Sequence, residues 1–173
     1  MILFNQFSTT TGTSSSSPQA TEHLAQGNDP IELEYSFGAF KSSGWQPDAT
    51  YSETCTASWN DVFGVVSPLL IDEASDGVLK KALDQFVEDQ SLAHLATRKE
   101  LKGYELKAFK LDDNAFNTIK VQFLALRLMV KSTKRRARSV SDRAAYWMLT
   151  PYGESVMMSL RAVRRPLENS DNL

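Results

Sequence analysis

The chain has 173 residues, of which 42% are hydrophobic, and a formal net charge of −2 at pH 7, values ordinary for one soluble globular domain. Its single cysteine, Cys55, excludes an intramolecular disulfide, and with only two histidines the chain has too few ligands for the usual four-ligand zinc site. We therefore expect a reducing, cytoplasmic setting and no bound metal or cofactor.

The small net charge hides an uneven distribution. Residues 115–165 contain eleven Lys or Arg and two acids, whereas residues 1–114 contain eight basic and seventeen acidic residues. The two parts therefore carry about +9 and −9. An anionic partner such as nucleic acid is expected to meet the C-terminal third.

Neither export nor membrane insertion is expected. Residues 1–7 are apolar but too few for the hydrophobic region of a signal peptide, and they lack a basic leader. The richest apolar run, residues 116–130, is interrupted by Lys120 and Arg127 and falls short of the roughly 20 apolar residues that cross a bilayer.

The N-terminal part combines an arm with two strands. Residues 1–29 are expected to form a disordered arm, because their Ser- and Thr-rich sequence offers little apolar surface to offset the entropy of ordering. Residues 31–40 then alternate between apolar and polar side chains, the period of a half-buried strand, and residues 52–57 predict a second, shorter strand.

Two amphipathic helices are expected next. Ser58 is a plausible N-cap for a helix that carries Trp59 and Phe63 toward the core and ends before Pro68. Ser75 or Asp76 then caps a second helix. Its inward positions are expected to be Val78, Leu79, Leu83, Phe86 and Val87, and its water-facing positions Lys80, Lys81, Asp84, Glu88 and Asp89.

Between residues 90 and 110 the patterns are weaker. Residues 92–102 predict a short helix that ends at Gly103, and residues 104–109 alternate like a strand.

The most regular helical pattern begins at Asp112 or Asp113. Its inward stripe consists of Phe116, Ile119, Phe123, Leu126 and Val130. On a neighbouring face, Lys120, Arg127 and Lys131 also lie three or four residues apart. The helix is therefore expected to align three positive charges beside its buried stripe.

A basic segment and a last helix close the chain. Residues 131–138 are strongly basic and lead to the apolar residues 146–149, which predicts a hairpin with a charged tip. Thr150 is the expected N-cap of the last helix, with Pro151 at its first position and Val156, Met157, Leu160 and Val163 on its inward side. Residues 166–173 are expected to form a flexible tail.

Residues 115–165 resemble the winged-helix domains of bacterial regulators, in which a recognition helix is followed by a wing that a Tyr-x-Leu-Thr-x-x-Gly phrase closes. Here the phrase is Tyr-Trp-Met-Leu-Thr-Pro-Tyr-Gly at residues 146–153, with one extra residue between Tyr and Leu. The stretch from Ser58 to this phrase is also similar to the C-terminal segment of an uncharacterised bacterial family, where it follows sensor-like or TIR-like domains. That second resemblance implies a module that reads a partner or a state.

These patterns predict an α+β fold. It comprises a mostly helical, winged-helix-like bundle with a two-stranded wing and a small N-terminal part that contains strands. One compact domain is expected over residues 30–165, with the winged-helix-like part at residues 75–165.

The function that this fold predicts is non-catalytic binding of nucleic acid, as duplex DNA, mainly through the phosphate backbone. The residues expected to contact phosphate are Lys120, Arg127, Lys131, Lys134, Arg135, Arg136, Arg138 and Arg143. Sequence-specific binding is less expected, because the helix offers only Asn117 and Gln122 as base-reading amides. The alternative is a protein-interaction or oligomerisation module that docks an acidic partner, such as the acidic half of a second copy. A solvated basic loop with no partner is the simplest interpretation.

Other reactive side chains have structural explanations. His94 lies near acids in the sequence, but no Ser or Cys stands in a nucleophile-like context beside it. Asp112 and Asp113 are more typical of helix caps than of metal ligands, and Cys55 is typical of a buried small hydrophobe. The tryptophans are expected to pack in the core. Catalysis therefore has no support in the sequence.

Overall fold

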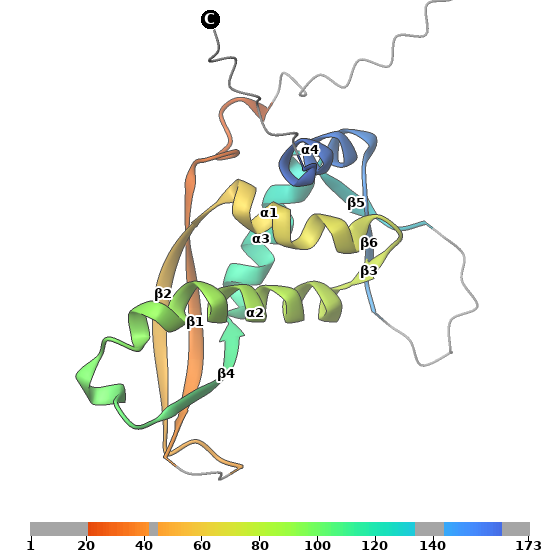
Figure 1. Cartoon of the computed structure of the whole chain (residues 1–173). Helices are drawn as coiled ribbons and strands as arrows, with labels where there is room; N and C mark the ends of the chain where they lie inside the picture. Colours follow the sequence, from red (N-terminus) through yellow and green to blue (C-terminus); the bar gives the residue numbers. More distant parts are fainter. Residues whose placement is uncertain (1–20, 42–44, 134–143, 164–173) are drawn as a thin grey trace, which may run out of the picture.

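The computed structural model describes residues 21–41, 45–133 and 144–163. In this part of the chain, four α-helices accompany two three-stranded antiparallel sheets, with strand orders β2-β1-β4 and β3-β6-β5 (Figure 1). The mixture of helices and sheets confirms the expected α+β class.

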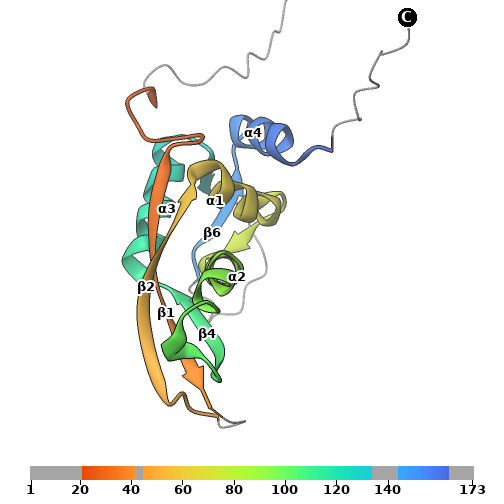
Figure 2. The ribbon, with the colours of Figure 1, turned by 60° about the vertical axis from the view of Figure 1, so that its left-hand side comes forward.

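The first sheet is built on β1 (Pro30–Phe40), which lies between β2 (Ala49–Ser58) and β4 (Glu105–Leu111). The predicted alternation of β1 is confirmed, because its apolar residues Ile31, Leu33, Tyr35 and Phe37 are buried while Glu32 and Glu34 are exposed. β2 is longer than predicted and pairs with β1 over its whole length. Figure 2 shows β1 and β2 as a long curved pair along one side of the molecule.

Two helices follow with the caps that the sequence predicts. α1 (Trp59–Val66) begins in a capping box, in which Ser58 and Asp61 each accept a hydrogen bond from the other's backbone N–H. α2 (Asp76–Leu95) begins at Ser75, whose hydroxyl accepts from the backbone N–H of Val78. A 3₁₀ turn, η2 (Ser67–Leu70), and the two-residue strand β3 (Ala74–Ser75) separate them.

The structure corrects the predicted helix at residues 92–102. α2 continues to Leu95, and only a 3₁₀ turn, η3 (Lys99–Leu101), follows before β4. Two positions of α2 also differ from the prediction, because Val78 is 47% exposed and Asp84 is buried. Asp84 accepts hydrogen bonds from the β4 end, which explains how a carboxylate comes to face inward.

α3 (Asp113–Ala125) begins at its N-cap Asp112 as predicted, but it ends earlier than the apolar stripe suggests. Arg127 adopts a positive φ of 55°, and the chain then enters β5 (Met129–Lys131). Val130 and Lys131 therefore lie on a strand, and Arg127 lies in the connecting turn. This is a correction to the predicted helical row of Lys120, Arg127 and Lys131.

The last two elements are β6 (Tyr146–Leu149) and α4 (Pro151–Arg161), which Thr150 caps as predicted. On the inward side of α4, Met157 is buried, whereas Leu160 is 37% exposed and Val163 lies beyond the helix and is fully exposed. Of the tryptophans, Trp59 and Trp147 are buried, but Trp45 is 89% exposed. The expectation of a core position is therefore wrong for Trp45.

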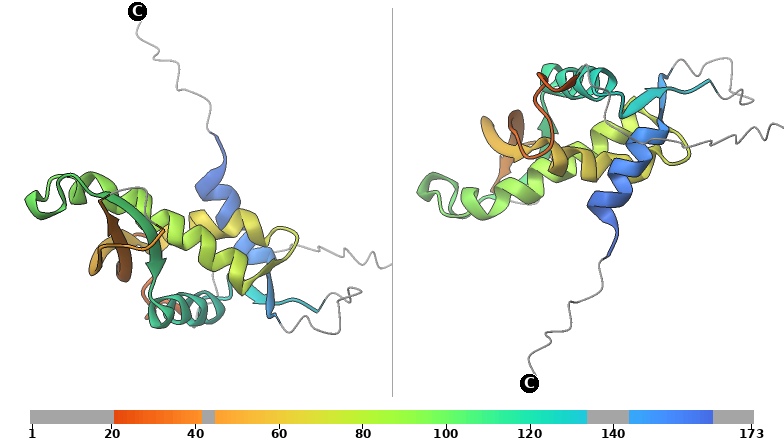
Figure 3. Two further views of the ribbon diagram at one scale, coloured as in Figure 1. Left: turned by 90° about the horizontal axis from the view of Figure 1, so that it is seen from below. Right: turned by 90° about the horizontal axis from the view of Figure 1, so that it is seen from above.

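One hydrophobic cluster joins both sheets and all four helices. The rings of Trp59 and Phe63 in α1 meet the ring of Phe123 in α3 edge-on, at centroid distances of 5.9 and 5.2 Å. Figure 3 shows α3 and α4 on opposite sides of the pair formed by α1 and α2.

Residues 21–29, which the sequence assigns to the arm, belong to this folded body. The backbone N–H groups of Trp59 and Asn60 donate to the carbonyl oxygens of Asp29 and Gly27, at 3.2 and 2.8 Å. The remainder of the predicted arm and the tail at residues 166–173 lie outside the described residues.

Candidate nucleic-acid interface

The second sheet forms the base of the predicted wing. β5 and β6 are antiparallel partners with Met129 opposite Leu149 and Lys131 opposite Trp147, which confirms the predicted hairpin strands. The other edge of β6 pairs with β3, a strand that the sequence did not predict because two residues are too few to show a period. Residues 134–143 between the two strands lie outside the described residues.

A close contact connects the end of β6 and the start of α4 to the turn after α3. The hydroxyl of Thr150 donates to the carbonyl oxygen of Arg127 at 2.5 Å and accepts from the backbone N–H of Gly153 at 2.9 Å. A Cβ at Gly153 would lie 1.8 Å from the carbonyl oxygen of Leu128, so no side chain fits there. The Leu-Thr-x-x-Gly part of the phrase thus fastens α4 against the turn between α3 and β5.

Lys120, the first residue of the predicted basic row, is held inside this region. Its amine lies 2.9 Å from a carboxylate oxygen of Asp76, and its side chain is only 17% exposed. The same amine lies over the rings of Phe116 and Trp147, 5.1 and 5.2 Å from their centroids. Lys120 therefore has a protein partner for its charge, and in this arrangement it does not face solvent as a free phosphate contact.

Trp147 completes this cluster, which sequence reasoning missed. Its indole N–H donates to the other carboxylate oxygen of Asp76 at 2.7 Å. Asp76, the first residue of α2, thus links α2 to α3 through Lys120 and to β6 through Trp147. The three residues are 27 to 71 positions apart along the chain, so no local pattern could have grouped them.

The two other predicted cations with described positions are exposed. Arg127 lies in the turn after α3, and Lys131 lies at the end of β5 beside the start of the connecting segment. Neither forms an ion pair with another residue of the described part of the chain. The remaining predicted contacts, Lys134, Arg135, Arg136, Arg138 and Arg143, lie outside the residues that the structure describes.

After Asp113, its first residue, the exposed face of α3 is neutral. It presents Asn114, Asn117, Thr118, Val121 and Leu124. Gln122, one of the two amides considered for base reading, instead donates to the carbonyl oxygen of Ala25 at 2.5 Å. Asn117 is therefore the exposed member of that pair.

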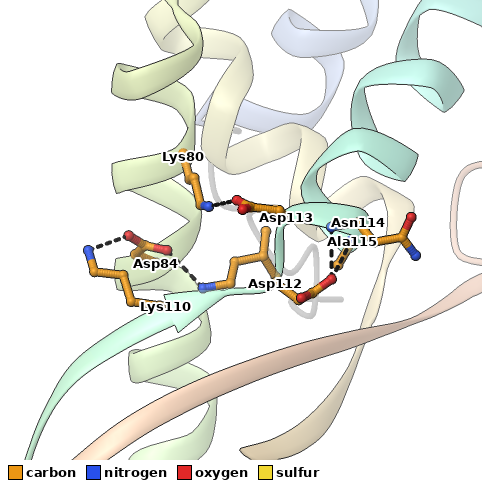
Figure 4. Close-up of polar contacts among 8 residues, drawn as sticks. Lys80, Asp84, Lys110, Asp112, Asp113, Asn114 and Ala115 are labelled. Carbon is orange, nitrogen blue, oxygen red and sulfur yellow. Dashed lines mark hydrogen bonds and ion pairs between the residues drawn. The ribbon is translucent and has the colours of Figure 1, made fainter.

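The N-terminal end of α3 is occupied by acidic groups that have partners (Figure 4). The carboxylate of Asp112 accepts from the backbone N–H groups of Asn114 and Ala115, and Asp113 forms an ion pair with Lys80 of α2. Nearby, Asp84 binds the amine of Lys110 and the backbone N–H of Leu111, both at 2.8 Å. These contacts fix the junction between β4 and α3 to α2.

A cavity of about 510 Å³ lies beside this junction. Its charged lining residues are Glu34, Glu53, Lys80, Lys110, Asp112 and Asp113. Lys80 pairs with Asp113 across this lining, whereas Lys110 pairs with Asp84 and Glu53 pairs with Arg98. Within residues 21–41, 45–133 and 144–163, no three His, Cys, Asp or Glu side chains gather in a way that could hold a metal ion.

Two side chains that could do covalent chemistry, Cys55 and Tyr35, have raised pKa values. Burial raises the pKa of the half-buried Cys55 thiol and also that of the Tyr35 hydroxyl. A raised pKa keeps both groups protonated near neutral pH, which is the opposite of what a nucleophile needs. His94 lies in the last turn of α2.

Comparison with known proteins gives no match: no family model, no curated protein and no solved structure resembles the chain closely enough to be assigned. In the described part of the chain, no helix combines the length and apolar character needed to cross a membrane. The assignment of function therefore depends on the geometry described above.

Proposed function

We propose that this protein is a winged-helix-type module that binds nucleic acid mainly through the phosphate backbone. The single observation that carries the proposal is the second sheet. Its strands have the order β3-β6-β5, and the chain runs α1, β3, α2, α3, β5, β6, which is the order of elements in a winged helix. The departure from that order is β4, which lies between α2 and α3 and joins the first sheet.

In this proposal the wing and the turn before it contact phosphate. Arg127 is exposed in the turn before β5 and Lys131 is exposed at the end of β5, and the basic residues of the segment that joins β5 to β6 add to them. Phosphate contacts by Lys and Arg supply most of the affinity of non-specific nucleic-acid binding. Lys120 is not a phosphate contact in this proposal. Its amine pairs with Asp76 and so helps to hold α3 against the base of the wing.

The neutral face of α3 supports binding with little sequence preference. Asn117 is an exposed amide that could pair with a base edge, but no exposed Lys or Arg accompanies it on the helix. The acids at the start of α3 disfavour a close approach of phosphate to that end. Backbone contacts from the wing side are therefore the main expected source of affinity.

The test is a fluorescence-anisotropy titration of labelled duplex DNA at two salt concentrations. The parent is compared with Arg127→Ala, Lys131→Ala and a variant in which Lys134, Arg135, Arg136 and Arg138 become Glu. Each lost phosphate contact should reduce the slope of log affinity against log salt by about 0.9. Lys120→Gln is the matched control inside α3, and it should keep the parental slope.

The results separate the alternatives clearly. Salt-sensitive binding that is weakened by the wing variants but not by Lys120→Gln supports the proposal. No binding of the parent at low salt, or an affinity that does not depend on salt, contradicts it.

A second candidate is a module that docks an acidic protein partner. The observation that favours a protein partner is the apolar part of the α3 face, where Val121 is 65% exposed and Leu124 is 37% exposed. The acidity of that partner is expected from the basic residues of the C-terminal third. If the acidic surface of a second copy is that partner, reversing Arg135 and Arg136 should weaken assembly. Reversing Glu88 and Asp89 in the same chain should restore it.

A further inference from the structure

β2 forms one edge of the first sheet, and its second side has no strand partner among the described residues. The strand is ten residues long and contains neither Pro nor Lys nor Arg. Its one charged residue, Glu53, is already paired with both guanidinium nitrogens of Arg98. A long regular strand of this kind presents a row of backbone donors and acceptors that can pair with another strand.

The opposite edge of the same sheet is protected. β4 has an irregular register with β1 where Ala108 takes a positive φ of 58°, and it carries two exposed lysines, Lys107 and Lys110, of which Lys110 pairs with Asp84. Bulges and edge lysines are the devices that natural sheets use to prevent edge pairing. β4 has both a register irregularity and edge lysines, and β2 has neither. The β4 edge is therefore protected against strand pairing, whereas the β2 edge is open to it.

The side chains of β2 also remain partly uncovered. Tyr51, Cys55 and Ala57 point to the core side but are only half-buried, whereas their cross-strand partners Phe37, Leu33 and Ile31 in β1 are buried. The difference arises because β1 has a neighbour on both sides and β2 has one. A strand added to β2 would cover this apolar row.

We propose that β2 pairs antiparallel with β2 of a second copy of this chain, which joins the two sheets into one of six strands. The outward row of β2 is Thr50, Ser52, Thr54 and Thr56. Across the two-fold axis, each outward pair of this row therefore joins one Ser or Thr to another. Such pairs are favourable across strands and carry no like charge. A two-fold axis also keeps both α2 helices on the same side of the joined sheet, because opposite residues share a face.

A second copy is favoured over a strand of another protein because the Ser and Thr row of β2 is complementary to itself. In an isologous contact the same surface of both copies meets itself, so that surface must be complementary to itself. The outward row of β2 meets this requirement in several strand registers, because its four side chains are uncharged and all carry a hydroxyl. The contact is narrow, since it consists of one strand from each chain. We therefore expect a weak dimer, with dissociation at about 10 to several hundred micromolar.

Sedimentation velocity of the full chain over this concentration range tests the proposal. The variant is Ser52→Lys, and the matched control is Ser36→Lys, because Ser36 faces Ser52 directly on the central strand β1 and on the same face. Ser52→Lys introduces the edge lysine that β2 lacks and should raise the dissociation constant at least about tenfold. Ser36→Lys adds the same charge away from the edge and should leave dimerisation within about twofold of the parent.

Cysteine cross-linking gives a second measurement that does not depend on a weakened variant. In a Cys55→Ser background, Ser52→Cys, Thr54→Cys and Thr56→Cys are oxidised mildly, with Ser36→Cys as the control. Each variant is oxidised alone and in a mixture with each of the other β2 variants, because the register decides whether a position faces itself or its neighbour in the outward row. Pairing of β2 with itself predicts a disulfide-linked dimer with a maximum at one β2 position or one pair of β2 positions, and none at Ser36. A parent that stays monomeric at all concentrations, or a dimer that forms no cross-link from β2, overturns the proposal.

Discussion

Gly153 shows how one residue can determine the geometry of a whole joint. Its φ is not positive, so the residue is required for space alone: any Cβ would overlap the carbonyl oxygen of Leu128 at 1.8 Å. The carbonyl group of Leu128 is part of the backbone and cannot move aside as the end of a flexible side chain can. The turn after α3 and the start of α4 therefore depend on the absence of a side chain at this position.

We expect Gly153→Ala to lower the free energy of unfolding by roughly 2–4 kcal/mol, because the helix must move away from the turn. Gly64→Ala is the matched control, since Gly64 is also helical but a Cβ added to it would have no atom within 4 Å, and it should stabilise the protein by about 0.5–1 kcal/mol. Urea unfolding followed by circular dichroism measures both. Equal effects of the two substitutions would contradict the steric argument.

Cys55 provides a prediction about pH. Burial raises the pKa of its thiol, so the reactive thiolate is scarce at pH 8 and increases as the pH rises toward that pKa. Alkylation of the folded protein at pH 8 should be slower by about tenfold or more than alkylation of an exposed Thr54→Cys in a Cys55→Ser background. Equal rates would show that the Cys55 thiol is neither shielded nor perturbed.

Among the elements, the connection of α2, α3 and β6 depends on one carboxylate. Asp76 accepts hydrogen bonds from Lys120 and from the indole of Trp147, and its own backbone N–H donates to the carbonyl oxygen of Ala145. The N-terminus of a helix is also a favourable place for a negative charge. The first residue of α2 is thus a polar contact that links the second sheet to α2 and α3, in addition to the shared hydrophobic cluster.

Asp76→Ala should lower the free energy of unfolding by about 2 kcal/mol, because it leaves an indole donor and a partly buried amine without their acceptor. Lys120→Met should cost about 1 kcal/mol or less, since the aliphatic stem can still pack between Phe116 and Trp147. Denaturant titrations of the two variants and the parent give the comparison. A larger loss for Lys120→Met would mean that the interaction of the cation with the rings outweighs the hydrogen bonds of Asp76.

The helix starts, and the end of α1 before Pro68, could be predicted from sequence, whereas the end of α3 and the charge partners could not. Ser58, Ser75, Asp112 and Thr150 all cap the helices that follow them, because a cap is a contact over two or three residues. The end of α3 was missed because no glycine marks Arg127, whose positive φ ends the helix. Lys120 and Asp84 were both placed in solvent, since their partners lie far away along the chain.

At the scale of the whole molecule, the two sheets share one core. α2 contacts β2 and β4 of the first sheet and β3 of the second, and apolar residues of both sheets belong to the same cluster. In the described part of the chain, the strand-containing front and the second sheet thus share one hydrophobic cluster. The front part is therefore expected to support the proposed interface and not to act as a separate module.

This arrangement predicts a single cooperative unfolding transition. Far-UV circular dichroism follows both sheets, and the fluorescence of buried Trp59 and Trp147 follows α1 and the second sheet. In a Trp45→Phe variant, which removes the exposed indole, the two urea curves should coincide within error. Two separated midpoints would show that the sheets unfold independently.

The contacts of Thr150 and Gly153 also bear on how the sequence Leu-Thr-x-x-Gly is interpreted. In this chain β6 leads directly into α4 beside the carbonyl group of Leu128, and the hydroxyl of Thr150 followed three residues later by Gly153 meets the steric limit there. The sequence Leu-Thr-x-x-Gly is therefore explained here by the packing of backbone, without reference to a ligand. Residues that determine specificity are therefore expected among the exposed side chains around this contact, and not at Thr150 or Gly153 themselves.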